Sequence, residues 1–458
     1  MVTVVSSRVV HRRQEAHIYA VIRGGDFLLP HFHHRFSRVD KIWQISRICS
    51  IFPQQFRPSD NFSEATMSET RNIVVLGVAW AGLGTAHHIC KHLLPKLKSS
   101  GSGKYVLHLV DPSTHFWWHV AAPRQICSAE GNVSFEKSFV PIKDGFKQYT
   151  NLQDSLVFHQ ASASALDTQS RKVTLTKPDG STESLEYWAL IISTGVRTPT
   201  PLTGFQGDHT VSQNALREAN TKLKSAQVIV VSGGGPVGVE TAGELGAHFG
   251  GKAKIVLVTA GKKLLPVFNE SRAKKAESLL KKLGVEVRYN TKVNGQNDLG
   301  NGKTEVLLSS GEPIQADVYI PAFGVQPNTE WLPNDLKDNK GFVSTNEKTL
   351  RVDKAGARVY AAGDVSGVDS GGVMNMYSSL PVLHANIDHD LLSEAKAGNV
   401  AEKTYNFVPK ETQFVPVGPK TGVAAFNGWS VPGFVVSFAK GRDYMVSRMD
   451  GFTEGKKW

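Results

Sequence analysis

A glycine-rich segment in the middle of the chain, Gly233-Gly234-Gly235-Pro236-Val237-Gly238, places the tightest constraint on how this sequence folds. An apolar stretch at 228–231 precedes it and a helical pattern follows, which predicts a strand, a tight turn and a helix. In such a unit the glycines permit the turn, let a pyrophosphate approach the backbone and let helix and strand pack closely. Backbone N–H groups and the positive helix end then bind phosphate. We therefore expect a dinucleotide at Gly233, Gly235, Pro236, Val237 and Gly238.

An earlier segment, Gly77-Val78-Ala79-Trp80-Ala81-Gly82, follows the apolar stretch 73–76 and has the same form. Ala79 stands where the fingerprint has its second glycine, so this match is weaker on its own. Asp111 strengthens it, because an acid after the next expected strand (105–110) can accept hydrogen bonds from an adenosine ribose. The Ser/Gly loop at 99–103 explains why Asp111 lies 29 residues after Gly82 rather than about 20. A structural glycine turn with a capping Asp is the alternative. We predict a second dinucleotide site at Gly77, Ala79, Trp80, Ala81, Gly82 and Asp111.

Two such turns about 155 residues apart predict two dinucleotides, one bound permanently and one exchanging. A third glycine cluster, Tyr360-Ala361-Ala362-Gly363-Asp364, places an acid at a strand end, where it can bond a ribityl hydroxyl of a flavin. Gly363 and Asp364 therefore join the predicted site. The strand after the second turn ends at Thr259 without an acid, and Lys262 and Lys263 follow, so NADH and NADPH both stay open.

The rest of the chain alternates strands and helices, which is typical of parallel α/β architecture. We expect helices at about 83–97, 213–225 and 270–283, strands at 254–259 and 359–363, short strands over 155–192, and a β-rich segment after 396. The predicted fold class is α/β, with two Rossmann-like dinucleotide-binding domains, the second inserted in the first, and a small α+β C-terminal domain. The expected bounds are 67–210 and 326–395 for the first dinucleotide-binding domain, 211–325 for the inserted second one and 396–458 for the C-terminal domain.

The net charge of +11 is spread unevenly along the chain. Residues 1–66 carry nine basic and five acidic residues, and Met67 closely precedes the first expected strand. Three interpretations of this extension stay open: a mispredicted start codon, a mitochondrial presequence, or a disordered arm. We accordingly expect a cytoplasmic location, or a mitochondrial one if the extension is a presequence. The remaining +7 accompanies phosphate-bearing ligands, and no DNA-binding motif is present, so no nucleic-acid partner is required.

The cysteines exclude one kind of redox chemistry. Cys49, Cys90 and Cys127 include no CxxC or CxxxxC spacing, so the chain lacks the cysteine pair of a disulfide reductase. Cys127 is expected to be a small buried thiol rather than a peroxidatic cysteine. The neighbouring Trp117-Trp118 pair either lines a slot for a flat electron acceptor or packs in the core.

The motifs and their order are similar to those of the pyridine nucleotide–disulfide oxidoreductase superfamily, flavoproteins with two dinucleotide-binding domains. The similarity is carried by Gly77–Gly82, Ile191–Gly195, Gly233–Glu240, Ala322–Asn328 and Tyr360–Asp364. Further stretches resemble the apoptosis-inducing-factor-like, ferroptosis-suppressor-like group and its fungal members: Leu109–Asp111, Val120–Arg124, Leu383–Ile387 and Lys440–Asp443. This resemblance implies FAD in the first domain, with Thr194 and Gly195 beside it. It implies NADH or NADPH as an exchanging cosubstrate in the inserted NAD(P)-binding domain, and an interface domain at the C-terminus.

The same resemblance implies roles for four side chains. Arg124 resembles a flavin-contacting arginine and Asp364 a ribityl-binding acid, while Glu240 resembles a glutamate required for activity and Lys440 a lysine near the quinone end of the site. Simpler interpretations stay open, because Glu240 would also complement a helix N-terminus and Lys440 would also suit an exposed turn. The helix expected to begin near Met376 would direct its N-terminus at the flavin O2.

These inferences predict an enzyme, an NAD(P)H-dependent FAD oxidoreductase that passes electrons to a quinone-type or other small acceptor without a redox cysteine pair. Two alternatives stay open: a flavin oxidoreductase with a dedicated substrate in specialised metabolism, and a redox-sensing or death-signalling flavoprotein. No metal is expected. Peripheral membrane contact and the oligomeric state are left open.

Overall fold

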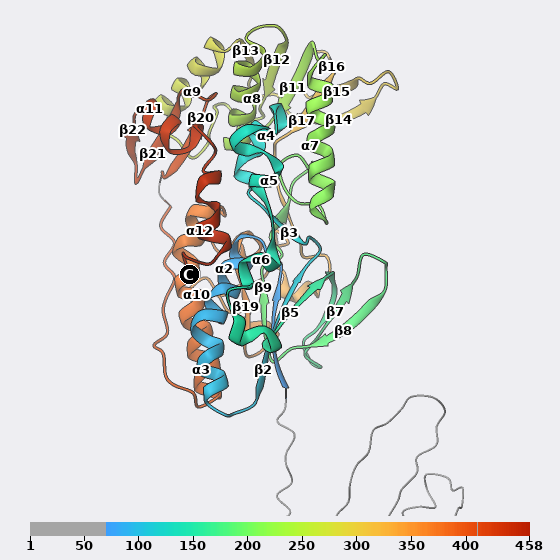
Figure 1. Cartoon of the computed structure of the whole chain (residues 1–458). Helices are drawn as coiled ribbons and strands as arrows, with labels where there is room; N and C mark the ends of the chain where they lie inside the picture. Colours follow the sequence, from blue (N-terminus) through green and yellow to red (C-terminus); the bar gives the residue numbers. More distant parts are fainter. Residues whose placement is uncertain (1–69, 410) are drawn as a thin grey trace, which may run out of the picture. The chain divides into compact units, whose positions relative to one another are not determined.

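Two parallel sheets organise the chain, one for each glycine-rich turn (Figure 1). The computed structural model describes residues 70–409 and 411–458, so the predicted extension 1–66 lies outside the described residues. The first sheet has the order β19-β9-β1-β2-β5, and all its neighbours are parallel. Its strands are β1 (Thr70–Leu76), β2 (Lys104–Asp111), β5 (Leu156–Gln160), β9 (Ala189–Ile192) and β19 (Val359–Ala361). The continuous apolar run in β1 is buried, as expected for a central strand covered on both faces.

The second sheet is also parallel and has the order β13-β12-β11-β17. It consists of β11 (Val228–Ser232), β12 (Lys254–Val258), β13 (Val285–Arg288) and β17 (Val318–Pro321). The chain leaves the first domain through β10 (Val196–Arg197) and returns through β18 (Gln326–Pro327), and these two strands pair antiparallel. The predicted insertion of one Rossmann-like domain in another is therefore correct, whereas the exact domain bounds stay a prediction.

Smaller antiparallel sheets complete the β structure. Three of the short strands predicted over 155–192 form an antiparallel sheet: β6 (Ser162–Asp167), β7 (Lys172–Thr176) and β8 (Thr182–Glu186). The inserted domain carries β14 (Val293–Asp298), β15 (Thr304–Leu308) and β16 (Ile314–Ala316). In the first domain, β3 (His115–Trp117) and β4 (Phe139–Pro141) pair antiparallel, with helical turns between them in the sequence.

The helix after the first turn is longer than predicted. It begins at Trp80 and runs through α2 (Trp80–His88), a π-helical turn η1 (Ile89–Leu93) and α3 (Leu94–Ser99). The long helix α10 (Val373–Glu394) packs against α2 and α3 and begins three residues before the expected Met376. The earlier start follows from Gly371 and Gly372, whose positive φ values of 73° and 86° turn the chain directly into the helix.

The remaining helices are shorter or belong to the inserted domain. α7 (His209–Leu223), α8 (Pro236–Phe249) and α9 (Glu270–Lys282) agree with the predicted pattern. The short ones are η2 (His119–Ala121), α4 (Ala122–Cys127), η3 (Gly131–Val133), α5 (Phe135–Ser138), α6 (Ile142–Phe146), η4 (Thr150–Ser155), η5 (Asn334–Leu336), η6 (Asp353–Ala355) and η7 (Gly363–Ser366). Within residues 70–409 and 411–458, no helix combines the length and apolar character needed to cross a bilayer.

The C-terminal part is α+β, as predicted, although its strands cover only part of the segment after 396. An antiparallel sheet joins β20 (Gln413–Pro416), β21 (Gly422–Phe426) and β22 (Trp429–Val431). Helical turns follow: α11 (Gly433–Val436), the π-helical η8 (Ser437–Gly441), η9 (Val446–Arg448) and α12 (Met449–Thr453). β20 packs against α8 and β21 against α9, so this part lies against the inserted domain.

Candidate active site

The first glycine turn forms as predicted between β1 and α2. Gly77 has a φ of 86°, and its N–H donates to the Val110 carbonyl at 2.8 Å. A Cβ on Gly82 would lie 1.8 Å from the Gly77 carbonyl oxygen, so the helix can pack this closely onto the turn only with glycine at position 82. Ala79 precedes α2, and its carbonyl accepts the Leu83 N–H at 2.9 Å. This leaves the helix N-terminus and its turn in the arrangement that binds a pyrophosphate.

Asp111 braces this turn from the end of β2. Its Oδ2 accepts the Val78 N–H at 2.6 Å and its Oδ1 accepts the Ser113 N–H at 2.8 Å. Burial raises the pKa of the carboxyl to about 6, against the lowering effect of these two hydrogen bonds. The capping interpretation therefore describes its contacts in this structure. Each oxygen retains a second lone pair, so the ribose contact stays a prediction.

Trp80 lies in an aromatic cluster at the start of α2. Its ring centroid is 4.6 Å from that of Trp118 and 5.0 Å from that of Phe452, on the C-terminal helix α12. Its Nε1–H donates to His119 Nδ1 at 3.2 Å. Burial lowers the pKa of His119 to about 4, so at neutral pH the ring is uncharged and can accept this bond. Trp80 thus joins the first glycine turn to the C-terminal part.

The third glycine cluster meets the first turn. Gly363 has a φ of 70°, and a Cβ there would lie 2.8 Å from the Cβ of Ala81 on α2. Asp364 follows, and its Oδ1 accepts the Gly372 N–H at 2.7 Å, directly before α10. Burial raises the pKa of the Asp364 carboxyl, opposed by this hydrogen bond. The ends of β19, α2 and α10 therefore converge, as a flavin site in this domain requires.

Thr194 and Gly195 link the two segments of the first domain. The Thr194 hydroxyl donates to the Asn328 carbonyl at 2.9 Å, and the Asn328 side-chain amide donates to the Thr194 carbonyl at 2.8 Å. The Asn328 N–H donates to the Gly195 carbonyl at 3.0 Å. A Cβ on Gly77 would lie 3.0 Å from the Thr194 Cα, so this junction adjoins the first turn.

The second glycine turn is complete. A Cβ on Gly238 would lie 1.8 Å from the Gly233 carbonyl oxygen, which repeats the close packing of the first turn. Gly235 is the residue before α8, Pro236 is its first residue, and Val237 is exposed. No atom lies within 4 Å of the position that a Gly235 Cβ would take, so the backbone there is open to a ligand. The predicted residues fit a pyrophosphate at the start of α8.

The helix α8 also carries a buried charged cluster that joins three parts of the fold. Lys440, on η8, donates from Nζ to Glu240 Oε1 at 2.6 Å. One helical turn further on, Glu244 accepts two hydrogen bonds of 2.9 Å from Arg124, on α4. The Tyr444 hydroxyl donates to Glu244 Oε1 at 3.0 Å. We call these five residues the charged cluster: Arg124, Glu240, Glu244, Lys440 and Tyr444.

The electrostatics of Glu240 distinguish it from an ordinary helix-end acid. Its side chain is 4% exposed and that of Lys440 is 16% exposed. Burial raises the pKa of Glu240 to about 7, although the Lys440 ammonium opposes this rise. A carboxyl with such a pKa exchanges a proton near neutral pH, which is the property of a general acid or base. The interpretation of Lys440 as an exposed turn lysine is wrong, because its ammonium is paired inside the fold.

Arg124 makes contacts within the protein that the sequence did not predict. Besides Glu244, it donates from Nη2 to the Gly441 carbonyl at 2.6 Å and from Nη1 to the Arg442 carbonyl at 2.8 Å. Its guanidinium also lies 5.0 Å from the centroid of the Tyr444 ring. Arg124 therefore ties α4 to α8 and to the C-terminal part, and its contact with the flavin stays a prediction.

Two members of the charged cluster were missed at the sequence level. Glu244 follows Glu240 by four residues, so helical spacing places both on one face of α8 and could have identified it. Tyr444 has no such signal, because it and Met445 adopt φ values of 51° and 65° in a left-handed backbone. Each such non-glycine residue costs roughly 1–2 kcal/mol. Asp443 stabilises this bend by accepting the Met445 N–H at 2.9 Å.

Cys90, Cys127 and the tryptophan pair are structural, whereas Cys49 lies outside the described residues. Cys90 and Cys127 are buried and free, and burial raises the pKa of each thiol. Trp117 is fully buried and stacks on Phe139 with ring centroids 5.1 Å apart. Trp118 is also buried, and its Nε1–H donates to the Tyr444 carbonyl at 2.9 Å. The pair therefore packs in the core, and the interpretation as an acceptor slot is wrong.

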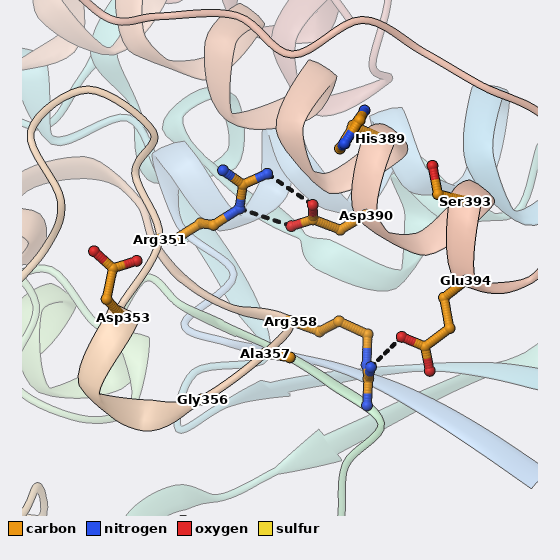
Figure 2. Close-up of a pocket in the computed structure, with 9 residues that line it drawn as sticks. All are labelled: Arg351, Asp353, Gly356, Ala357, Arg358, His389, Asp390, Ser393 and Glu394. Carbon is orange, nitrogen blue, oxygen red and sulfur yellow. Dashed lines mark hydrogen bonds and ion pairs between the residues drawn. The ribbon is translucent and has the colours of Figure 1, made fainter.

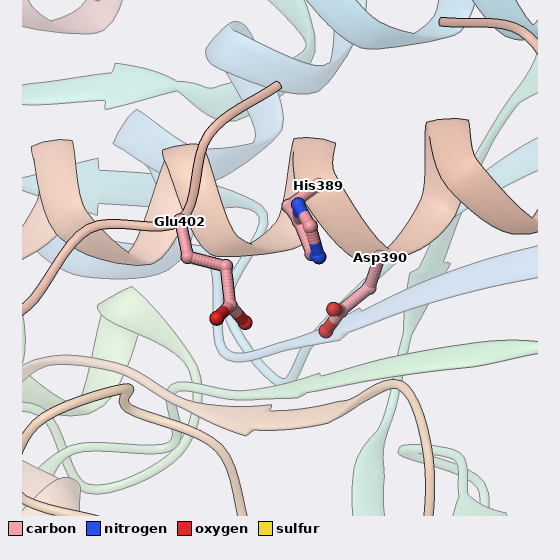
Figure 3. Close-up of side chains that lie close together, drawn as sticks. All are labelled: His389, Asp390 and Glu402. Carbon is pink, nitrogen blue, oxygen red and sulfur yellow. The ribbon is translucent and has the colours of Figure 1, made fainter. Parts of the chain in front are cut away.

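A separate polar pocket of about 470 Å³ lies beside α10 (Figure 2). Arg351 makes a bidentate pair with Asp390 at 2.8 and 2.7 Å there, and Arg358 pairs with Glu394. Figure 3 shows His389, Asp390 and Glu402, whose ligand atoms lie close enough together to hold a metal ion. Arg351 already pairs with both carboxylates. The pocket includes none of the predicted site residues.

Residues 71–383 match the family described as pyridine nucleotide-disulphide oxidoreductase. The chain belongs to this family. It is 37% identical over 416 residues to oxidoreductase phnG of Penicillium herquei, a match that covers 86% of this chain and 98% of that protein. It is 26% identical over 411 residues to ferroptosis suppressor protein 1 of Xenopus tropicalis, covering 84% and 96%.

A solved structure supports the same fold. The structure of NDH2 from Plasmodium falciparum in complex with NADH has a TM-score of 0.59 and 15% identity, and the match covers 85% of this chain and 98% of that one. The predicted fold class and the predicted resemblance are therefore confirmed. FAD and NADH or NADPH, the predicted cofactors, are those of this family. The two glycine turns are the segments that would hold them.

Proposed function

We propose that this chain is an enzyme that takes a hydride from NADH or NADPH onto FAD and passes the electrons to a quinone-type acceptor. The observation that carries the proposal is the buried Glu240–Lys440 pair. Glu240 lies on the helix that the second dinucleotide turn opens, and Lys440 comes from the C-terminal part. The chain is also 32% identical over 236 residues to demethylphylloquinone reductase NdbB of Synechocystis, which supports a quinone-type acceptor.

Bound FAD would supply the hydride acceptance and the electron transfer. The protein's own contribution is to position the ligands and to move a proton. Reduction of a quinone by NAD(P)H consumes one proton from solution in addition to the hydride. Lys440 can donate a hydrogen bond to a carbonyl oxygen of the acceptor. Glu240 can supply a proton to the same oxygen, because the Glu240 pKa of about 7 allows proton exchange near neutral pH.

Glu240→Gln tests this role, because it keeps the shape of the side chain and removes the titration. We expect normal FAD content and a fall in kcat of roughly 10²-fold with a ubiquinone analogue, since removing a general acid or base typically costs that much or more. The pH dependence near 7 should also disappear. Glu218→Gln, at an exposed glutamate on α7, is the matched control.

Comparing acceptors tests the substrate class. Steady-state rates with ubiquinone analogues should exceed those with cytochrome c, ferricyanide and oxygen. Indifference to quinones, with rapid turnover of another acceptor, would contradict the proposal and favour a dedicated small-molecule substrate. Unchanged kinetics in Glu240→Gln would remove Glu240 from the proton path.

A further inference from the structure

The C-terminal part presents large aromatic side chains to solvent. Phe426 is 52% exposed, Trp429 80%, Phe434 74% and Phe438 76%. We call these four residues the aromatic patch. They come from β21, β22, α11 and η8, which follow one another in the sequence; β21 contacts both β22 and α11, and α11 contacts η8 (Figure 1). Single exposed apolar side chains are ordinary, but four aromatic side chains this exposed within residues 426–438 indicate a contact surface.

The fold holds this patch in a defined position. Phe426 and Trp429 are direct cross-strand partners at the end of the β21–β22 hairpin. Arg272 of α9 bonds the hairpin turn, donating from Nε to Ser430 Oγ at 3.2 Å and from Nη2 to the Gly428 carbonyl. The hairpin is therefore fastened to the inserted domain, although its aromatic side chains face solvent.

The second aromatic pair lies on the helical turns that follow. Phe434 and Phe438 are four residues apart on α11 and η8, which continue one into the other. The Arg442 guanidinium lies 5.8 Å from the centroid of the Phe438 ring, so a cation borders the patch directly.

The charged side chains of the segment that carries the aromatic patch are all basic. Residues 412–442 contain no Asp or Glu but contain Lys420, Lys440 and Arg442. Lys440 is paired with Glu240, whereas Lys420 and Arg442 are exposed. Exposed aromatic side chains bordered by cations suit the boundary between lipid headgroups and acyl chains, where anionic lipids attract Lys and Arg.

We propose that the aromatic patch docks this protein on an anionic lipid surface. A second copy of the chain is a poorer occupant, because a two-fold contact would bring Lys420 and Arg442 of each copy near like charges. The proposal does not depend on the acceptor proposed above. It places Phe438 in the bilayer boundary two residues from Lys440, where a lipid-soluble acceptor would arrive.

Vesicle flotation of the full-length flavin-loaded protein tests the proposal, with phosphatidylcholine vesicles and with vesicles that also contain phosphatidylserine. We expect binding to the second kind that weakens as salt is added, because exposed charges are screened. The combined variant Trp429→Ser, Phe434→Ser, Phe438→Ser should bind at least about 10-fold more weakly, since each buried aromatic side chain contributes strongly to partitioning. Lys420→Gln and Arg442→Gln should each weaken binding about fivefold.

Matched controls separate the patch from general surface effects. Val267→Ser and Leu299→Ser remove exposed apolar side chains elsewhere, and Lys224→Gln and Lys252→Gln remove exposed cations elsewhere; all should bind as the unaltered protein does. The triple variant should still reduce ferricyanide with NADH, which shows that it is folded.

Three results would overturn the proposal. The unaltered protein would fail to float with phosphatidylserine vesicles, or the triple variant would float equally well. Alternatively, sedimentation velocity would show a dimer that the triple variant loses, which would identify a second copy as the occupant. A failure of quinone reduction alone would leave the lipid result standing, so the two proposals are distinguished.

Discussion

Lys440→Met is the perturbation that examines the charged cluster most closely. It removes the ammonium 2.6 Å from Glu240 Oε1 and keeps most of the apolar length of the side chain. Burial raises the pKa of Glu240 from 4.5 to about 7, and Lys440 opposes that rise. Without Lys440, we expect the pKa of Glu240 to lie well above 7.

The sign and size of the effect follow from proton linkage. A carboxyl whose pKa is raised by folding stabilises the fold fully below its unfolded pKa, and this contribution is lost as the pH rises to its folded pKa. For Glu240 the contribution lost between pH 4.5 and about 7 is about 3 kcal/mol. In Lys440→Met the loss continues above pH 7, at about 1.4 kcal/mol for each pH unit.

Urea unfolding followed by tryptophan fluorescence measures this difference. At pH 6 the variant and the unaltered protein should have similar free energies of unfolding, because Glu240 is largely protonated in both. Between pH 7 and 8 the variant should lose about 1.4 kcal/mol relative to the unaltered protein. Lys224→Met, at an exposed lysine, should show no such trend. If the difference in the free energy of unfolding between the two proteins did not change with pH, the reasoning would be refuted, because Lys440 would then have no effect on the pKa of Glu240.

Three further substitutions test other parts of the site. Arg124→Leu leaves the buried Glu244 carboxylate without its cation and should lower the free energy of unfolding by about 3–5 kcal/mol, as measured by urea unfolding. Adding Glu244→Leu should restore most of this loss. Losses that simply add in the double variant would argue against the pair. Gly82→Ala places a Cβ 1.8 Å from the Gly77 carbonyl oxygen and should yield protein without bound flavin, as read from its visible spectrum. Asp364→Ala should lower the flavin content per chain, and a normal flavin absorbance band would contradict its predicted role.

Features that depend on a few adjacent residues were predictable from the sequence. Both glycine turns formed where their glycines allow helix and strand to touch, because that requirement is local. The strand run before Gly77 was recognisable from its apolar residues, which the structure buries. The predicted start of α10 was three residues too late, because the positive φ values of Gly371 and Gly372 that turn the chain into the helix were not included in the sequence pattern.

Features that depend on distant segments were not predictable in the same way. Arg124 was assigned to the flavin, yet its hydrogen bonds go to Glu244, Gly441 and Arg442, more than a hundred residues away. The pairing of Glu240 with Lys440 joins residues 200 positions apart, so the sequence named both residues without showing that they touch. Tyr444 enters the cluster through a left-handed backbone that no local pattern indicates.

Anaerobic titration of the purified protein with NADH and NADPH, followed by addition of a ubiquinone analogue, tests the central claim most directly. The proposed function predicts a bound flavin whose visible absorbance is bleached by at least one of the two nucleotides and restored by the quinone. A flavin that neither nucleotide bleaches, or one that the quinone does not reoxidise, would contradict it.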